Sequence, residues 1–375
     1  MALNIVVDEN IPFAHEFFSS LGVVTRLPGR NLNTQHLQNA DILIVRSVTQ
    51  VNEELLAATP VKFVGTCTIG IDHLDVDYLQ TQGIAYHSAP GCNANSVVEY
   101  VFSALCQLGV NWNQKMVGII GCGNVGGRLY QRLRELGVKC RCYDPFLSSK
   151  QLSDLSSLEA VLACDIVCLH APITHTGTHP THHLLAHKEL EQLIQGAVLI
   201  NAGRGAVIDN SALLDTLKGR NDLKVVLDVW EHEPKINTEL MQYVDIATPH
   251  IAGYSLDGKM AGTDMVYRSL CEFLSVDCCF SGGKILNAMA INKKSYKTLI
   301  ETKSLDFCRL QELILTAYNI DSDNVRMRKA LMGKTGIALA ESFDKLRKNY
   351  PERREFHAHE NLFYEIERCF KAFLN

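Results

Sequence analysis

The N-terminal part of the chain alternates short, continuously apolar runs with stretches of helical periodicity. The apolar runs lie at residues 5–7, 41–45, 61–64 and 84–86, and helices are expected from Ile11–Pro12, over 53–58 and over 95–108. Strands that alternate with helices predict a parallel sheet with crossover connections. Because these runs lack polar alternation, we expect a sheet covered by helices on both faces.

A second alternation of the same kind follows the polar segment 111–114. Its apolar runs lie at residues 116–120, 138–143, 165–169, 197–200, 225–229 and 244–247, and a helical pattern follows over 257–274. Six strands with helices between them predict a second doubly wound parallel sheet. The fold class expected is therefore α/β, with a flavodoxin-like first domain and a dinucleotide-binding second domain.

The pattern changes after the glycines at 282 and 283. The last ninety or so residues are richer in charge and show helical periodicity near 305–317, 336–347 and 361–373. We predict a small α-rich domain whose basic clusters are solvated helix faces, or alternatively a surface between subunits. The predicted domains are 1–93 with 257–282, 94–256, and 283–375.

Composition narrows the possible partners and the location. Thirty-six basic against 41 acidic side chains give a net charge of −5, which argues against a protein built mainly to bind nucleic acid. The 13 cysteines include no C-x-x-C pair, and most lie in apolar runs, which favours buried thiols in a reducing cytosol. Because neither a signal peptide nor an apolar run of membrane-spanning length occurs, we expect a cytoplasmic protein without a membrane partner.

A dinucleotide-binding pattern joins the strand 116–120 to the next helix. Residues 121–126 form a G-x-G-x-x-G, in which Gly121 permits the tight turn, Gly123 admits a pyrophosphate and Gly126 lets helix pack on strand. Asp144 ends the following strand, where a carboxylate binds the ribose hydroxyls and repels a 2′-phosphate. The pattern therefore predicts NAD as the cofactor.

Three further side chains that could carry chemistry follow strands of the same domain. Arg204 follows the strand 197–200, Glu233 follows 225–229, and His250 follows 244–247. Each could be structural when taken alone, as a surface ion pair, a turn carboxylate or a loop histidine. Carboxyl ends of parallel strands line the ligand crevice, and an arginine fork binds carboxylates there. Their common placement favours a hydride-transfer site.

The residues from Gly121 through Asp144, Arg204 and Glu233 to His250 resemble the D-isomer-specific 2-hydroxyacid dehydrogenases. Three features depart from the common family pattern: Tyr254, a helical tail in place of a regulatory module, and Gly203 where many members have serine. With the segments 45–49 and 65–73, the first two narrow the resemblance to members that act on a small phosphorylated 2-hydroxyacid.

The resemblance implies a mechanism for the three side chains. Arg204 binds the C1 carboxylate of the substrate, and His250 takes the C2 hydroxyl proton as the hydride leaves for NAD. Glu233 binds the other imidazole nitrogen and fixes its tautomer. The resemblance also implies a homodimer that pairs through the helical tail.

Further contacts are expected by resemblance or by position. Ser47 and Thr68 are expected to contact the substrate by resemblance, and Arg46 and Tyr254 are placed near its phosphate by charge and position, although Arg46 could equally be a surface ion-pair partner. The cofactor contacts expected are Gly121, Gly123, Asn124, Val125, Gly126, Asp144, Thr174, Ala202, Gly203, Asp228 and Gly253.

Several alternatives stay open at this point. Histidines crowd into 175–183, but this is a turn-rich loop, and metal ligands need a fixed geometry with supporting contacts, so no metal is expected. The substrate could be another 2-hydroxyacid, such as 3-phosphoglycerate or D-glycerate. A non-catalytic NAD-binding interaction protein is a further alternative, which the complete set Arg204, Glu233 and His250 disfavours.

Overall fold

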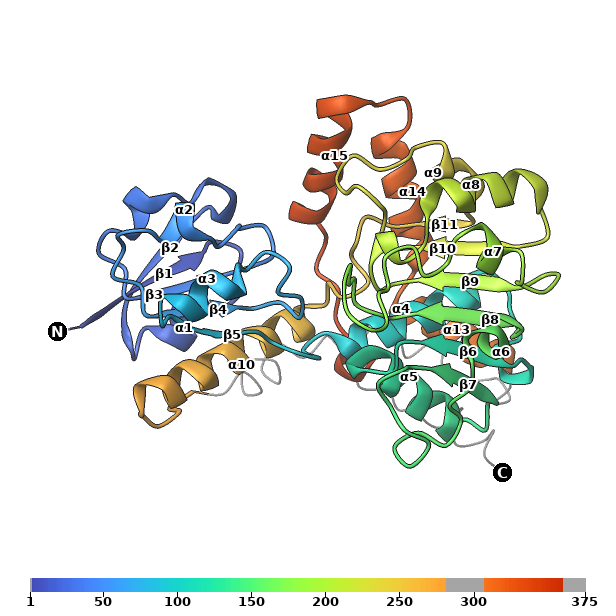
Figure 1. Ribbon diagram of the computed structural model, residues 1–375, viewed down its shortest axis with the longest axis horizontal. Coiled ribbons are helices and arrows are strands. Elements are labelled where there is room, and N and C mark those ends of the chain that lie inside the picture. Colours follow the sequence, from blue (N-terminus) through green and yellow to red (C-terminus); the bar gives the residue numbers. More distant parts are fainter. Residues whose placement is uncertain (1, 281–306, 360–375) are drawn as a thin grey trace. The chain divides into compact units, whose positions relative to one another are not determined.

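The computed structural model describes residues 2–280 and 307–359 of the chain. The described residues form two compact units, one of 2–93 with 254–280 and the other of 94–253 with 307–359 (Figure 1). The predicted division into three domains stays a prediction. Among the described helices, none has both the length and the apolar composition that a membrane crossing requires.

The first unit is built on a five-stranded parallel sheet. Its strand order is β2-β1-β3-β4-β5, which is the flavodoxin-like order expected. The strands are β1 Leu3–Asp8, β2 Gly22–Leu27, β3 Ile42–Val45, β4 Phe63–Thr66 and β5 Ala85–His87. The helices are α1 Ala14–Phe18, α2 Glu53–Leu56, α3 Val76–Thr81 and α10 Leu256–Leu274, with 3₁₀ turns η1 Gly29–Asn31 and η2 Thr34–Leu37.

Both faces of this sheet are apolar, as the unbroken runs predicted. Ile5 and Val7 join a core cluster that also holds Phe17 of α1 and Tyr267 of α10. Val6, between them in β1, points to the other face and joins the second cluster. Successive residues of one strand therefore supply two separate cores.

Two local predictions in this unit were wrong. Strand β2 was not predicted, because it is an edge strand whose residues are exposed or half-buried and include Thr25 and Arg26. The first helix begins at Ala14 rather than at Ile11, because Phe13 adopts a left-handed conformation with φ of 56°. The helices expected over 53–58 and 257–274 are confirmed as α2 and α10, and the one expected over 95–108 is confirmed in the second unit as α4 Ala94–Gln107.

The second unit contains a six-stranded parallel sheet in the order β11-β10-β9-β8-β6-β7, and all six predicted strands are confirmed. They are β6 Val117–Ile120, β7 Cys140–Tyr143, β8 Ile166–Leu169, β9 Val198–Asn201, β10 Lys224–Leu227 and β11 Ile246–Ala247. Its helices before the tail are α4 Ala94–Gln107, α5 Asn124–Glu135, α6 Leu158–Leu162, α7 His187–Leu190, α8 Asn210–Gly219 and α9 Leu240–Tyr243, with 3₁₀ turns η3 Trp112–Gln114 and η4 Gly205–Val207.

The direction of strand succession reverses between β6 and β8. From β6 the chain proceeds to β7 on one side, and an isolated parallel bridge from Cys142 to Leu155 extends the sheet by one pairing beyond β7. The chain then returns to β8 on the other side of β6 and continues outward to β11. Ligands of open α/β sheets bind at such a switch point, outside the carboxyl ends of the strands.

The described part of the tail packs on the second unit. It consists of α13 Phe307–Ala317, α14 Ile320–Leu331, α15 Gly336–Lys348 and η5 Phe356–Ala358. The predictions over 305–317 and 336–347 are confirmed where the chain is described, whereas 361–373 lies outside the described residues. Helix α14 was not predicted.

Helix α14 covers the edge of the sheet at β11 (Figure 1). The Asn324 side chain accepts a hydrogen bond from the Ala247 backbone N–H at 3.1 Å. Arg328 donates to the carbonyl oxygens of Met241 and Val244 at 2.5 and 2.6 Å. Because an edge strand leaves backbone groups unpaired, Asn324 supplies a partner for one backbone group of β11.

Candidate active site and dinucleotide site

The glycine-rich turn lies between β6 and α5, where the sequence predicted it. Gly121 has a φ of 84°, and a β-carbon on it would meet the Ala171 backbone nitrogen at 2.7 Å. A β-carbon on Gly126 would overlap the Gly121 carbonyl oxygen, whereas one on Gly123 would meet nothing within 4 Å. The turn therefore has no room for a side chain at Gly121 or Gly126. The space beside Gly123 is open, and a pyrophosphate would fit there at the start of helix α5.

Asp144 immediately follows β7 and is held by two backbone groups. One carboxylate oxygen accepts from the Cys122 N–H at 2.9 Å, and the other accepts from the Phe146 N–H at 3.1 Å. These contacts fix the carboxylate beside the glycine-rich turn. The carboxylate can therefore accept hydrogen bonds from the adenosine ribose hydroxyls of NAD, and its charge opposes a 2′-phosphate.

Arg204, Asp228 and His250 lie at the carboxyl ends of neighbouring strands. Arg204 follows β9, Asp228 directly follows β10, and His250 follows β11. The Arg204 guanidinium donates to the Gly203 carbonyl oxygen at 3.0 Å, and Asn201 donates to the Arg204 carbonyl oxygen at 3.0 Å. The three residues therefore follow neighbouring strands at the same edge of the sheet.

His250 and Glu233 form a hydrogen-bonded pair. The Nδ1 atom of His250 lies 2.8 Å from Oε2 of Glu233, and Oε1 of Glu233 accepts from the Trp230 N–H at 2.9 Å. Burial alone would raise the pKa of Glu233, but the charge and hydrogen bond of His250 and the charge of Arg347 outweigh it and hold that pKa below its usual value. Because the Glu233 carboxylate is ionised, it accepts the hydrogen bond, and Nδ1 of His250 carries the shared proton. Nε2 is the ring nitrogen that this pair does not use.

Asp228 holds the loop that carries His250. Its carboxylate accepts from the Thr248 hydroxyl at 2.7 Å and from the N–H groups of Ile251 and Ala252 at 2.8 and 2.9 Å. The His250 N–H donates to the Asp228 carbonyl oxygen at 2.7 Å, and His250 has a φ of 58°. Asp228 is buried, and burial raises its pKa despite these partners and the opposing charge of His250. The predicted cofactor contact of Asp228 stays a prediction beside this structural role.

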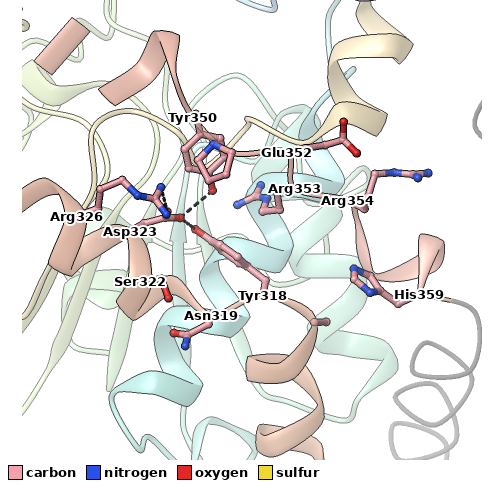
Figure 2. Close-up of a pocket in the computed structure, with 12 residues that line it drawn as sticks. Tyr318, Asn319, Ser322, Asp323, Arg326, Tyr350, Glu352, Arg353, Arg354 and His359 are labelled. Atoms are coloured by element: carbon pink, nitrogen blue, oxygen red, sulfur yellow. Dashed lines mark hydrogen bonds and ion pairs between the residues drawn. The ribbon is translucent and has the colours of Figure 1, made fainter. Parts of the chain in front are cut away.

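Arg353 connects the tail to the same loop. Its guanidinium donates to the Ala252 carbonyl oxygen at 2.6 Å and also to the hydroxyl and carbonyl oxygens of Ser96. Its Cζ atom lies 4.2 Å from the centre of the Tyr318 ring. Figure 2 shows Arg353 beside Tyr318 and Tyr350, whose hydroxyls both donate to Asp323 at 2.8 Å. A buried arginine of the tail therefore supports the backbone two residues after His250.

The remaining predicted cofactor contacts occupy turns of the second unit. Thr174 lies in a loop closed by Thr181, whose hydroxyl accepts from the Thr174 N–H at 2.8 Å and donates to the Pro172 carbonyl oxygen at 2.6 Å. The others lie at the start of α5, after β9 and after Ala252, and they are Asn124, Val125, Ala202, Gly203 and Gly253. Their contacts with the cofactor stay predictions.

The four predicted substrate contacts belong to the first unit. Arg46 lies 3.2 Å from the buried carboxylate of Asp8, so the ion-pair alternative for Arg46 is present in the structure. The Thr68 hydroxyl lies 2.8 Å from that of Thr66. Ser47 follows β3, and the ring of Tyr254 lies 4.8 Å from the Lys259 ammonium group. Their contacts with substrate stay predictions.

A doubly wound domain with this glycine-rich turn, and with these side chains at the carboxyl ends of its strands, is typical of NAD-dependent dehydrogenases. Residues 96–252 match the model of the D-isomer specific 2-hydroxyacid dehydrogenase NAD binding domain, and residues 290–360 match a domain of unknown function. The chain is 52% identical to an erythronate-4-phosphate dehydrogenase of Cellvibrio japonicus, over 95% of this chain and 93% of that protein. The one from Teredinibacter turnerae is 48% identical, over 94% and 93%. The chain belongs to the D-isomer-specific 2-hydroxyacid dehydrogenase family, and its tail is included in these matches.

Solved structures share the fold over part of the chain. An NAD⁺-bound 3-phosphoglycerate dehydrogenase of Entamoeba histolytica has a TM-score of 0.63 and 24% identity, covering 73% of this chain and 96% of its own. A D-lactate dehydrogenase from Aquifex aeolicus, complexed with NAD and lactic acid, has a TM-score of 0.62 and 23% identity, covering 72% and 95%. These likenesses confirm the predicted fold.

We expect Arg353→Ala to lower both stability and turnover, because it leaves the Ala252 carbonyl oxygen and Ser96 without their charged donor. Breaking such a buried contact costs about 3 kcal/mol of the free energy of unfolding, measured by denaturant titration. Arg268→Ala is the control, since its exposed ion pair with Asp264 is worth less than about 1 kcal/mol. Equal stability of the two variants would contradict the role of Arg353.

Proposed function

We propose that the protein oxidises 4-phospho-D-erythronate at C2 with NAD, giving 2-oxo-3-hydroxy-4-phosphobutanoate in pyridoxine 5′-phosphate biosynthesis. The observation that carries the chemistry is the hydrogen-bonded pair of His250 and Glu233 at the ligand edge of the dinucleotide domain. The substrate is supported by relatives of that name, whose similarity extends through the tail. The His250–Glu233 pair and the names of the relatives are both consistent with a small phosphorylated 2-hydroxyacid as ligand.

The side chains divide the work of the reaction. Arg204 binds the C1 carboxylate, and its charge polarises the C2 oxygen. His250 accepts the hydroxyl proton at Nε2 as C2 loses its hydride and the C2–O bond becomes a carbonyl. NAD, when bound, supplies the acceptor for that hydride. Glu233 stabilises the imidazolium that forms, because it stays ionised when His250 becomes charged.

The substrate contacts proposed are Ser47, Thr68, Arg46 and Tyr254. Ser47 and Thr68 follow β3 and β4, so they lie at the carboxyl ends of neighbouring strands of the first sheet. Hydroxyls there suit the polar end of a hydroxyacid. Arg46 supplies the positive charge that a phosphate needs, and Tyr254 supplies a hydroxyl donor.

The substrate assignment is tested with purified protein, NAD and a panel of acids, read by NADH absorbance. The panel contains 4-phosphoerythronate, erythronate, 3-phosphoglycerate and D-glycerate. We expect kcat/KM to be highest for 4-phosphoerythronate by a factor of about 100 or more, because a site built for a phosphate leaves charged groups unpaired without it. Comparable rates with unphosphorylated acids would contradict the assignment, and no turnover at all would favour an NAD-binding interaction protein.

The role of Glu233 predicts the pH dependence of its glutamine variant. The carboxylate stays ionised at neutral pH and favours the protonated form of His250, whereas oxidation needs the neutral form. Glu233→Gln should therefore move the acid limb of the kcat/KM profile for oxidation to lower pH. The reductive direction, which needs the protonated form, should weaken near neutrality.

Glu239→Gln is the matched control, because it removes the same charge from an exposed ion pair with Lys218 in the same unit. Its profile should coincide with that of the parent protein. An unmoved acid limb in Glu233→Gln would refute the proposed role of Glu233.

We further propose that the protein is a cytoplasmic homodimer that pairs through residues 283–375. The described tail carries the exposed apolar side chains Val325, Met332 and Ile337, the last of which is 74% exposed. Exposed apolar side chains on an otherwise charged segment suit a two-fold interface. The cytoplasm is supported by the cysteines, since every one that the structure describes is a free thiol.

Ile337→Asp should shift the dimer towards monomer in sedimentation or light-scattering measurements, because a charge would be buried in the proposed interface. Val276→Asp is the control, since Val276 is 46% exposed and lies outside the tail. A dimer that is equally stable in both variants would argue against pairing through α15.

A further inference from the structure

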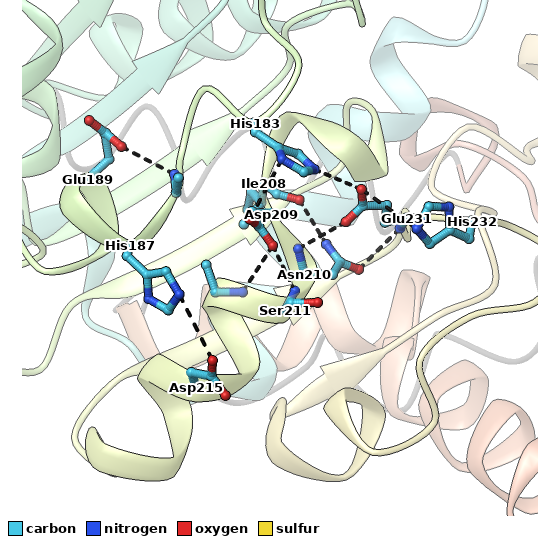
Figure 3. Close-up of polar contacts among 12 residues, drawn as sticks. His183, His187, Glu189, Ile208, Asp209, Asn210, Ser211, Asp215, Glu231 and His232 are labelled. Atoms are coloured by element: carbon cyan, nitrogen blue, oxygen red, sulfur yellow. Dashed lines mark hydrogen bonds and ion pairs between the residues drawn. The ribbon is translucent and has the colours of Figure 1, made fainter.

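Two histidines and a carboxylate meet outside the catalytic pair, and we propose that they bind a divalent transition-metal ion such as Zn²⁺. Among the described residues, His182, His183 and Glu231 place one ligand atom each so that all three lie within 4.8 Å of one another. Figure 3 shows His183 directed at Glu231, with Asp209 and Asn210 beside them. Neither cofactor nor substrate contacts are assigned to these three side chains.

The His183–Glu231 contact is close to the geometry of a shared metal ion. Nε2 of His183 lies 2.8 Å from Oε1 of Glu231, so one proton now lies between the two atoms. Two ligands at about 2.0–2.1 Å from a tetrahedral Zn²⁺ lie roughly 3.3 Å apart. An ion can therefore replace the proton after a separation of a few tenths of an ångström.

The other atoms of these two ligands are held by the protein. Oε2 of Glu231 accepts from the Asn210 N–H at 3.1 Å, and the Asn210 side chain accepts from the Glu231 N–H at 3.1 Å. Nδ1 of His183 lies 3.6 Å from Asp209, whose carboxylate also caps helix α8. Metal centres use a carboxylate behind a histidine ligand to orient the ring. Here Asp209 lies on that side of His183 just beyond hydrogen-bond distance, and Asn210 fixes Glu231 through two hydrogen bonds.

His182 is exposed and would supply the third ligand after its ring turns out of the stack on His183. Its ring is stacked on that of His183, with ring centres 3.9 Å apart and planes 20° apart, and the ring of His175 lies 4.7 Å away on the same loop. Imidazole nitrogens with one carboxylate suit Zn²⁺ and its neighbours, whereas Mg²⁺ and Ca²⁺ prefer oxygen ligands. Water can complete a tetrahedral set.

The site connects two segments that matter for the proposed reaction. The His182 N–H donates to the Thr174 carbonyl oxygen at 3.0 Å, so the ion would be anchored to the loop of a predicted cofactor contact. Glu231 lies two positions before Glu233 in the chain. An ion bound here would tie that loop to the segment of the catalytic carboxylate and would stabilise the folded chain by linkage.

The experiment uses the untagged full-length protein, freed of metal with a chelator and dialysed. Titration with Zn²⁺ should show one ion per chain with a dissociation constant on the order of micromolar or tighter, and the thermal midpoint should rise with Zn²⁺. His182→Gln and Glu231→Gln should each weaken binding at least about tenfold and reduce the thermal shift. His187→Gln is the control: His187 is an exposed histidine on α7, shown in Figure 3 near Asp215, and its loss should change neither quantity.

Co²⁺ provides a second measurement, because its visible spectrum reports direct coordination by nitrogen. The parent protein should give a tetrahedral spectrum that His182→Gln loses. Because His182 is exposed, its replacement should leave the fold intact. His182→Gln therefore tests metal binding even where Glu231→Gln lowers stability. The absence of Zn²⁺ binding by the parent, or equal affinities of the parent and His182→Gln, would overturn the proposal.

Discussion

The geometry of the candidate active site depends on one buried carboxylate, that of Asp228. A carboxylate away from water is unfavourable unless several donors compensate it, and Asp228 receives them from one hydroxyl and two consecutive backbone N–H groups. Those two N–H groups converge on it because His250 adopts a left-handed conformation. The need to compensate one buried charge therefore determines the backbone on which the imidazole stands.

The tail belongs to this arrangement within its own chain, whatever its part in a dimer. Arg353 holds the carbonyl oxygen of Ala252, whose N–H group is held by Asp228, so both sides of that peptide segment are fixed. Arg347 of α15 adds a positive charge that lowers the pKa of Glu233. Helix α14 pairs backbone groups at the sheet edge that β11 leaves open. A family domain that ends before the tail would need other groups for these contacts.

The sequence predicts most of the second sheet and the edge where Arg204 and His250 lie, because continuous apolar strands and their carboxyl ends are local signals. It misses β2, an edge strand without a buried residue that is interrupted by Thr25 and Arg26, and α14, whose sequence is largely polar. The contact from Arg353 to Ser96 joins residues 257 positions apart, and no local pattern indicates it. The sequence likewise does not indicate a metal site at the histidine loop, because the loop itself contains no carboxylate. Glu231, which contacts His183, follows β10 and lies 48 positions later in the chain.

The surroundings of the two carboxylates near His250 shift their pKa values in opposite directions, and the two carboxylates have different roles. Asp228 is enclosed, and burial raises its pKa even though four groups oppose that effect. For Glu233 the opposing charges of His250 and Arg347 outweigh burial, so its pKa is lowered. One carboxylate therefore holds the backbone of the loop, and the other holds the proton on Nδ1. Because their contacts share only His250 itself, a change at Glu233 can alter the protonation of the imidazole while the loop keeps its conformation.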